Sequence, residues 1–373
     1  AVLPRGLYFE KAHQAISSVF RVCEGINLAK IRSRAKNLCS ELDLPVLARE
    51  IGKSDKLSLN LFFTTKTHKE GAPFRTIVSE RNSWQYELGR FLQDKLKLFP
   101  VEDPFRIFNS GEVVNFLKQH PGARFRAFSI DIKDLYYSLP HEGLLACIDE
   151  CIDSFGAVPF QNTTGISSKG FLELLSLYIT STFVEWNGKT YIQKEGVSIG
   201  SSIAPFLSDL LLAKFDRALN VKLGELSVVK TFRYVDDYLL ILRCDLETFH
   251  SKVMQVLQIF RECLYPLVVT HEMPERNSIR FLDLKISFSE NHTCWCYEPR
   301  SQKPVLPFSS AHSKLVKRGI VQSCFHNALE RSCHHVLEAS LLAQSERLER
   351  EGYPRTLLIS VAEAMHRKRK RLG

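Results

Sequence analysis

The sequence predicts an α+β fold in which antiparallel hairpins alternate with amphipathic helices. Three observations lead to this prediction. Residues of high β propensity flank Asn187-Gly188, a pair that supplies the positive φ angles of a tight turn. Short runs of apolar and β-branched residues flank a second turn in segment 228–242. From Lys314 onward the sequence is helical in character, with a break at Gly352-Tyr353-Pro354.

The size and composition of the chain limit the class of protein to which it can belong. It has 373 residues, so we expect one large multi-lobed unit or two to three domains. Hydrophobic residues make up 45% and charged residues 24%, which is typical of a globular protein. The formal net charge of +9 favours a polyanionic partner such as nucleic acid. A basic soluble protein without such a partner is the alternative.

Ten cysteines are scattered along the chain, and their spacing matches no paired zinc motif. The close pairs are Cys147 with Cys151 and Cys294 with Cys296. The tripeptide Cys333-His334-His335 lacks a second cysteine pair nearby, so we interpret it as helix-surface and core residues. We expect reduced thiols and an intracellular protein. We recognise no signal peptide and no apolar run long enough to cross a bilayer, so we expect no membrane partner.

The N-terminal part of the chain has helical periodicity, and we expect residues 1–55 to form a helical extension. Two short strands in segment 58–80 then flank a turn. Lys66, Lys69 and Arg75 place positive charge around this hairpin, which could grip a triphosphate. A solvated basic loop is the alternative.

Two helical segments, 84–98 and 111–119, precede an apolar strand in segment 124–132. Asp131 lies near the end of that strand, where a carboxylate is well placed to hold a metal at the sheet edge. An N-cap or loop acid is the ordinary alternative. The next helix begins near Pro140, because proline suits a first helical turn.

A loop rich in glycine and small hydroxyl residues spans 196–205, after an apolar helix over 169–183 and the Asn187-Gly188 hairpin. Gly200 lets the backbone of this loop approach a ligand closely. A long helix follows the loop, so the loop could meet a base pair or a phosphate at the helix N-terminus. Alone the motif is weak, as any glycine-rich loop is.

Asp236 and Asp237 lie at the tight turn of the 228–242 hairpin. Adjacent carboxylates repel each other, and apolar surroundings disfavour their ionised form. A bound divalent cation removes this cost, and carboxylate oxygens suit Mg²⁺. An ordinary Asp-Asp hairpin turn is the alternative.

The C-terminal third contains further elements. We expect a helix over 246–263, strands over 267–271 and 280–287, and a turn-rich boundary over 288–309. The basic run Arg367–Arg371 is either a solvated tail, a phosphate-binding segment or a nuclear-import signal.

The order of these features is more specific than any one of them. A basic hairpin, a strand-end Asp131 with Tyr136 five residues on, the small-residue loop and then Tyr234-Val235-Asp236-Asp237 follow one another. In this order the sequence resembles a reverse transcriptase over residues 60–290. Within that class it is most similar to the reverse transcriptases of Penelope-like retroelements, which are relatives of telomerase. The segments that indicate this closer resemblance are Lys66-Thr67-His68-Lys69, Arg75–Ser79, Gln193–Ser201, Phe281-Leu282-Asp283 and Leu348–Pro354.

The resemblance implies a right-hand polymerase fold with fingers, an antiparallel-sheet palm and a helical thumb. We expect the N-terminal extension over 1–55, fingers and palm over 56–290, a linker over 291–310, and a helical thumb with a basic tail over 311–373. Many members of the family end in a GIY-YIG endonuclease, which we do not recognise in this chain. Either the element does not cleave its own target, or this copy is truncated.

The resemblance also assigns roles to residues. Asp131, Asp236 and Asp237 would be the catalytic carboxylates that hold two Mg²⁺ ions, with the main-chain carbonyl of Ile132 as a further ligand. Tyr136 would stack beneath the incoming sugar and exclude a 2′-hydroxyl. The other predicted nucleotide contacts are Lys66, Lys69, Arg75, Gly200 and Tyr234, and the predicted primer grip is Phe281, Leu282, Asp283, Leu284 and Lys285.

We therefore expect an RNA-directed DNA polymerase that binds an RNA template, a DNA primer and dNTPs in the nucleus. A catalytically decayed or domesticated copy that only binds nucleic acid is the first alternative, because the same positive charge would serve it. Another two-metal enzyme, such as a nuclease, is the second. The basic hairpin and Tyr136 have no evident use in a nuclease.

Overall fold

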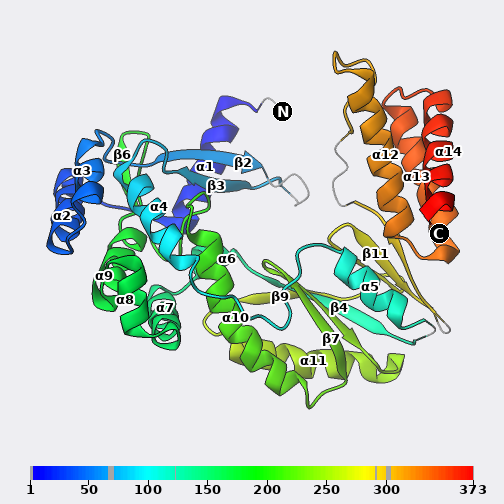
Figure 1. Ribbon diagram of the computed structural model, residues 1–373, viewed down its shortest axis with the longest axis horizontal. Coiled ribbons are helices and arrows are strands. Elements are labelled where there is room, and N and C mark those ends of the chain that lie inside the picture. The colour runs from blue at the N-terminus through cyan, green and yellow to red at the C-terminus, as the bar shows by residue number, and fades with distance from the viewer. Residues whose placement is uncertain (1–2, 66–70, 122, 290–291, 300–303, 373) are drawn as a thin grey trace. The chain divides into compact units, whose positions relative to one another are not determined.

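The computed structural model describes residues 3–65, 71–121, 123–289, 292–299 and 304–372. The chain divides into two compact units (Figure 1). The first unit comprises Ala1–Pro104, Ile132–Asn220 and Arg261–Val268, and the second comprises Phe105–Asp131, Val221–Phe260 and Val269–Gly373. Within the described ranges, no helix combines the length and the apolar character needed to span a membrane.

The first unit contains a three-stranded sheet of order β1-β6-β5. β5 (Phe183–Trp186) and β6 (Lys189–Gln193) form the hairpin that the sequence predicts. Asn187 and Gly188 have φ angles of 50° and 73°, so both central residues have the positive φ of a type I′ turn. The short strand β1 (Phe20–Val22) completes the sheet and was not predicted, because the helical periodicity of its surroundings hides it.

A second hairpin of the first unit joins β2 (Asn60–Thr65) to β3 (Phe74–Ser79), as predicted. Residues 66–70 of its turn are outside the described ranges, and so are Lys66 and Lys69. The buried apolar cluster beside these strands comprises Ile16, Phe20, Leu59, Val78, Val184 and Tyr191.

Helices form the remainder of the first unit. They are α1 (Arg5–Val19), α2 (Leu28–Glu41), α3 (Pro45–Lys53), α4 (Trp84–Leu96), α6 (Leu135–Ser138), α7 (His141–Phe155), α8 (Ala157–Thr164), α9 (Ser168–Ile179) and α10 (Ala204–Leu223). Serine caps fix two of the starts, because Ser83 accepts a hydrogen bond from the Tyr86 amide and Ser167 accepts one from the Gly170 amide.

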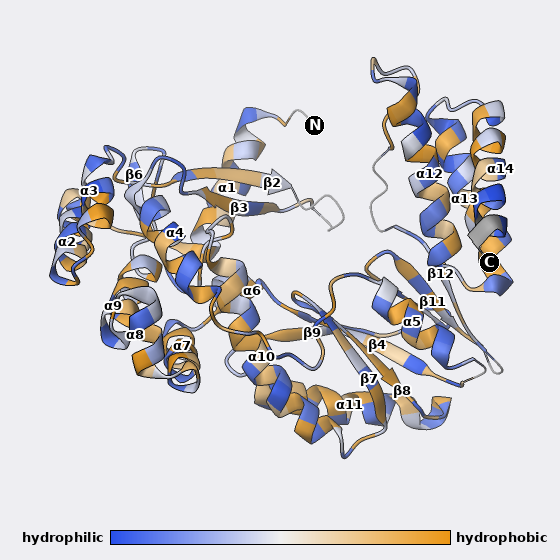
Figure 2. Cartoon of the chain, in the orientation of Figure 1, coloured by the Kyte–Doolittle hydropathy of each residue, from blue (hydrophilic) through white to orange (hydrophobic). Residues whose placement is uncertain are grey.

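The second unit is built on a four-stranded antiparallel sheet of order β7-β8-β4-β9. Its strands are β7 (Val228–Tyr234), β8 (Asp237–Leu242), β4 (Arg126–Ile132) and β9 (Val269–Glu272). Helix α11 (Leu246–Cys263) packs on one face, where the ring of Tyr238 lies 5.1 Å from that of Phe260. Figure 2 shows hydrophilic and hydrophobic residues alternating around α11, as an amphipathic helix on a sheet requires.

The other face of this sheet contributes to a second core. Ala127, Leu239 and Ile241 belong to one buried cluster with residues of α5 (Gly111–Gln119) and of a three-stranded sheet. That sheet comprises β10 (Ser278–Phe281), β11 (Leu284–Phe288) and β12 (Thr293–Tyr297).

The prediction of one continuous strand over 280–287 was wrong. The chain turns at Leu282-Asp283, where Leu282 has a φ of 54°, and β10 pairs with β11 so that Phe281 is opposite Leu284. Buried residues alternate with less buried ones on both strands, on either side of the two-residue turn. The sequence pattern alone therefore does not reveal the turn. β12 follows within segment 288–309, where we expected turns.

A helical bundle closes the second unit. α12 (Lys314–Glu330), the 3₁₀ turn η1 (His334–Val336), α13 (Leu337–Arg350) and α14 (Arg355–Leu372) confirm the predicted helices and the predicted break at Gly352-Tyr353-Pro354. Their shared core comprises Val321, Cys324, Phe325, Leu348, Tyr353, Leu358 and Val361. The basic run Arg367–Arg371 continues the last helix.

Candidate active site

Three acidic residues meet at one end of the second unit's four-stranded sheet. The antiparallel register of β4 and β8 places Asp131 directly opposite Asp237. Side chains of directly opposed residues project to the same face, with Cβ atoms typically about 4.5–5.5 Å apart. Asp236 precedes Asp237 in the β7–β8 turn, and all three acids are partly buried. The fold therefore brings together acids that are about a hundred positions apart in sequence, at a spacing that one cation can bridge.

The turn that holds Asp236 has an unusual backbone. Tyr234 pairs with Asp237, so Val235 and Asp236 form a two-residue loop. Val235 has a φ of 58°, a conformation that is rare for a β-branched residue and common for glycine at this position of a hairpin. Such strain costs on the order of 1–3 kcal/mol and persists only where the surroundings hold it.

Arg233 holds this turn through a hydrogen bond, and the sequence analysis did not identify it. Its side chain is fully buried, and its Nη1 donates a hydrogen bond to the carbonyl oxygen of Val235 at 2.9 Å. Its main chain is fixed on the other side, because its N–H donates to Phe105 O at 2.6 Å and its carbonyl accepts from Ile107 N at 2.8 Å. A buried guanidinium two residues before Val235 thus stabilises the strained turn. Burial of Arg233 depends on a segment more than a hundred residues earlier, so alternation within β7 does not predict it.

In the first unit, the loop that contains Gly196 and Gly200 is fastened between two elements. The Val197 N–H donates to Tyr136 O at 2.7 Å, and the Val78 N–H donates to Ile199 O at 2.9 Å. Both glycines have positive φ angles, 76° and 110°. A Cβ at Gly196 would overlap the carbonyl oxygen of Tyr136, and one at Gly200 would overlap that of Val78. Close backbone packing therefore requires glycine at both positions.

Three predicted nucleotide-binding residues, Arg75, Tyr136 and Gly200, lie in the first unit. Gly200 lies against β3, which carries Arg75 on an exposed position, and Tyr136 lies partly buried on α6. The neighbouring Tyr137 ties α6 to β3, because its hydroxyl donates to Thr76 O at 2.9 Å. Burial raises the pKa of Tyr137, which keeps this hydroxyl protonated and able to donate.

A buried polar network supports the end of this loop and was also missed by the sequence analysis. The Tyr178 hydroxyl donates to the carboxyl of Glu80 and lies 2.6 Å from Ser201 Oγ. Burial raises the pKa of Glu80 to about 7, although hydrogen bonds from Tyr178, Ser202 and Ser201 act in the opposite direction. The three side chains come from segments far apart in sequence, which is why no local pattern indicated them.

The five predicted primer-grip residues have different surroundings. Phe281 and Leu284 are fully buried in the core of the second unit. Asp283 accepts hydrogen bonds from the Ser110 hydroxyl and from the Arg331 guanidinium, so it ties the β10–β11 turn to the end of α12. Leu282 is partly buried in that turn.

Lys285, the last of the five, faces a groove within the second unit. The groove has a volume of about 900 Å³ and is also lined by Arg347 and Arg350 of α13. Glu298 and Glu351 line the same groove, so it combines three cationic with two acidic side chains.

Comparison with known protein families shows which family the chain belongs to. The family model described as reverse transcriptase (RNA-dependent DNA polymerase) matches residues 68–267, which is more than half of the chain. The chain belongs to the reverse transcriptase family. The matched segment contains Asp131, Asp236 and Asp237, together with Arg75, Tyr136 and Gly200. A search among curated proteins gave no match.

Solved structures show the fold of this reverse transcriptase. Telomerase from Candida albicans, in complex with the TWJ fragment of telomeric RNA, is similar at a TM-score of 0.61 and 13% identity, covering 96% of this chain and 61% of that chain. Apo telomerase from Candida tropicalis has a TM-score of 0.49 and 14% identity over 93% of this chain and 67% of that one. The BmCPV RNA-dependent RNA polymerase has a TM-score of 0.44 and 13% identity over 85% and 28%.

The likeness to the Candida albicans telomerase confirms the predicted right-hand polymerase fold. The chain spans about three fifths of the length of that telomerase.

Proposed function

We propose that the chain is the RNA-directed DNA polymerase of a Penelope-like retroelement and extends a primer 3′-hydroxyl with dNTPs. The observation that supports this most directly is the opposition of Asp131 and Asp237, with Asp236 adjacent, inside the segment that matches the family. The Penelope-like assignment rests on sequence motifs, among them Phe281-Leu282-Asp283 and Gly352-Tyr353-Pro354.

The three carboxylates suit a hard divalent cation. They offer only oxygen donors, they are partly buried, and like charges held this close are stabilised by a cation between them. We propose that Asp131, Asp236 and Asp237 hold two Mg²⁺ ions, with the main-chain carbonyl of Ile132 as a further ligand. When bound, such ions activate the attacking hydroxyl and neutralise the charge that develops on the leaving pyrophosphate.

The chain's own residues supply position rather than covalent chemistry. Arg233 fixes the strained turn at Val235, so Asp236 and Asp237 are preorganised before substrate arrives. Arg75 is exposed and forms the bidentate fork that suits a triphosphate, assisted by Lys66 and Lys69.

The remaining nucleotide contacts set substrate choice. The ring of Tyr136 excludes a ribose 2′-hydroxyl and so selects dNTPs. Gly200 and Tyr234 contact the nucleotide or its templating base, and Tyr234 is exposed at the end of β7.

Template and primer are held by basic surfaces. We propose that segment 281–285 is the primer grip and that Lys285, Arg347 and Arg350 contact the nucleic-acid backbone along their shared groove. In this proposal residues 1–55 are an extension, 56–290 are fingers and palm, 291–310 are a linker, and 311–373 are the thumb with a basic end. The run Arg367–Arg371 then serves phosphate binding or nuclear import.

Primer extension tests the proposal. We expect Asp236→Asn to reduce Mg²⁺-dependent dNTP incorporation on an RNA template by about three orders of magnitude or more, the range typical of groups that stabilise phosphoryl transfer. Asp245→Asn is the matched control, because Asp245 is an exposed acid of the same unit away from the sheet end. Circular dichroism verifies that both variants fold.

The outcomes separate the alternatives. Undiminished incorporation by Asp236→Asn refutes the assignment of the carboxylates. A wild-type chain that retains primer-template on a filter without extending it is a nucleic-acid-binding module instead of a polymerase. Metal-dependent cleavage of the template without extension indicates a nuclease.

A further inference from the structure

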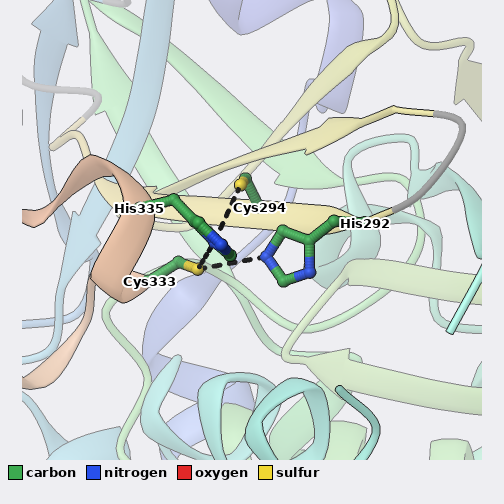
Figure 3. A group of neighbouring side chains, drawn as sticks. All are labelled: His292, Cys294, Cys333 and His335. Atoms are coloured by element: carbon green, nitrogen blue, oxygen red, sulfur yellow. Dashed lines mark hydrogen bonds between the residues drawn. The ribbon is translucent and has the colours of Figure 1, made fainter. Parts of the chain in front are cut away.

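Two histidines and two cysteines converge in the second unit, far in sequence from the catalytic carboxylates. His292 immediately precedes β12 and Cys294 lies in it, and Cys333 and His335 come from the segment around η1, between α12 and α13 (Figure 3). One potential ligand atom from each side chain lies within 4.8 Å of the others. Figure 3 shows that the four side chains point toward a common centre.

The distances within this cluster match tetrahedral zinc coordination. Cys333 Sγ lies 3.2 Å from His292 Nε2 and 3.2 Å from His335 Nδ1, and Cys294 Sγ lies 3.9 Å from His335 Nδ1. Zinc bonds of about 2.3 Å to sulfur and about 2.0 Å to nitrogen, at tetrahedral angles, place ligand atoms about 3.3–3.8 Å apart. These three spacings fall within a few tenths of an ångström of that range, and all four ligand atoms lie within 4.8 Å of one another.

The backbone around the cluster is held by hydrogen bonds that need no metal. His292 and Cys294 are alternate residues and so project to one face of the strand. The Cys333 N–H donates to Trp295 O at 2.8 Å, which docks the second ligand pair against β12. The His292 N–H donates to Ser289 Oγ at 3.2 Å, and its carbonyl accepts from the Ser289 N–H at 3.0 Å. The site is therefore preformed.

We propose that His292, Cys294, Cys333 and His335 bind one Zn²⁺ ion in a closed structural site. Binding replaces the two thiol protons, so two thiolates and two neutral imidazoles balance the charge of the ion. Four protein ligands leave no open position, so this zinc fastens β12 to the start of α13 and takes no part in catalysis.

Two neighbours of the cluster provide internal controls. His334 is adjacent to His335, but it is not part of the four-residue group. Cys296 follows two residues after Cys294 on β12 and is also outside the group. The donor set itself excludes Mg²⁺ as the preferred ion, because thiolate and imidazole ligands select zinc over hard cations.

Metal analysis of the full chain tests the proposal. We expect protein purified with a reductant and without chelator to contain one zinc per chain by inductively coupled plasma mass spectrometry. His335→Ala and Cys333→Ser should each lose most of this zinc, whereas His334→Ala and Cys296→Ser should retain it. His335 is exposed, so His335→Ala keeps the proposal testable if Cys333→Ser does not fold.

Cobalt substitution gives a second measurement. Co²⁺ added to metal-free chain should produce the visible absorption of a tetrahedral thiolate site, and Cys294→Ser should weaken that absorption. The proposal is overturned by wild-type chain without stoichiometric zinc, by unchanged zinc in both ligand variants, or by a Cys294–Cys333 disulfide in freshly purified protein. None of these measurements depends on polymerase activity.

Discussion

The buried carboxyl of Glu80 should make the stability of the chain depend on pH between about 4.5 and 7. In the folded state its pKa is about 7, against an ordinary value of 4.5, because burial disfavours the charged form. Between these two values the folded state binds more protons than the unfolded state, so stability falls as pH rises. The stability that the folded state gains by holding the Glu80 carboxyl protonated is fully present below pH 4.5 and is lost above pH 7. At about 1.4 kcal/mol per pKa unit, the loss is about 3 kcal/mol.

The substitution Glu80→Gln isolates this effect. A glutamine keeps an acceptor for the Tyr178 hydroxyl and has no charge to bury. The free energy of unfolding of the variant should therefore match that of the wild type near pH 4.5 and exceed it by up to about 3 kcal/mol at pH 8. Urea unfolding followed by circular dichroism at four or five pH values measures the difference.

A surface carboxyl provides the control for Glu80. Glu185 is exposed on β5 of the same unit, so Glu185→Gln removes one negative charge without relieving a burial cost. We expect its difference from wild type to stay near zero across the range. A Glu80→Gln difference that does not change with pH would show that Glu80 is ionised without penalty, and the argument from burial would fail.

Two further predictions concern the proposed polymerase site. Tyr136→Ala should raise ribonucleotide incorporation relative to dNTP incorporation, measured as the ratio of the two kcat/KM values, and Tyr137→Phe should leave that ratio unchanged because its hydroxyl only ties α6 to β3. An unchanged ratio in Tyr136→Ala would exclude the sugar-gate role. Val235→Gly should raise the free energy of unfolding by about 1 kcal/mol, because relief of positive-φ strain exceeds the entropic cost of glycine. A less stable Val235→Gly variant would show that the turn is not strained.

The sequence predicted those elements whose signals are local. Asn187-Gly188 specifies its own hairpin, because both residues tolerate positive φ. Val235 has no such preference, yet the hairpin at Asp236 and Asp237 was predicted from the apolar strands on either side. The turn at Leu282-Asp283 has neither a glycine nor a break in the apolar alternation, so it was read as continuous strand.

In the candidate site, too, some residues were predicted from sequence motifs, whereas others depend on contacts with remote segments. The order of motifs predicted Asp131, Asp236 and Asp237 as a group, and the β4–β8 register opposes two of them. Arg233 escaped prediction because the main-chain hydrogen bonds that fix it join it to Phe105 and Ile107, which are remote in sequence.

The cluster of His292, Cys294, Cys333 and His335 is the clearest case of a feature formed by segments remote in sequence. Zinc motifs are recognised by ligands that lie close together in the chain, and here each half of the donor set is a residue pair with only one residue between its members. The two halves are about forty residues apart, with α12 between them. Hydrogen bonds from the Cys333 N–H to Trp295 O and from the Tyr297 N–H to Ser332 Oγ join the two segments. The spacing rule led us to interpret Cys333-His334-His335 as surface and core residues. The rule tests for one local arrangement, whereas metal binding depends on where the fold places the sulfur and nitrogen atoms.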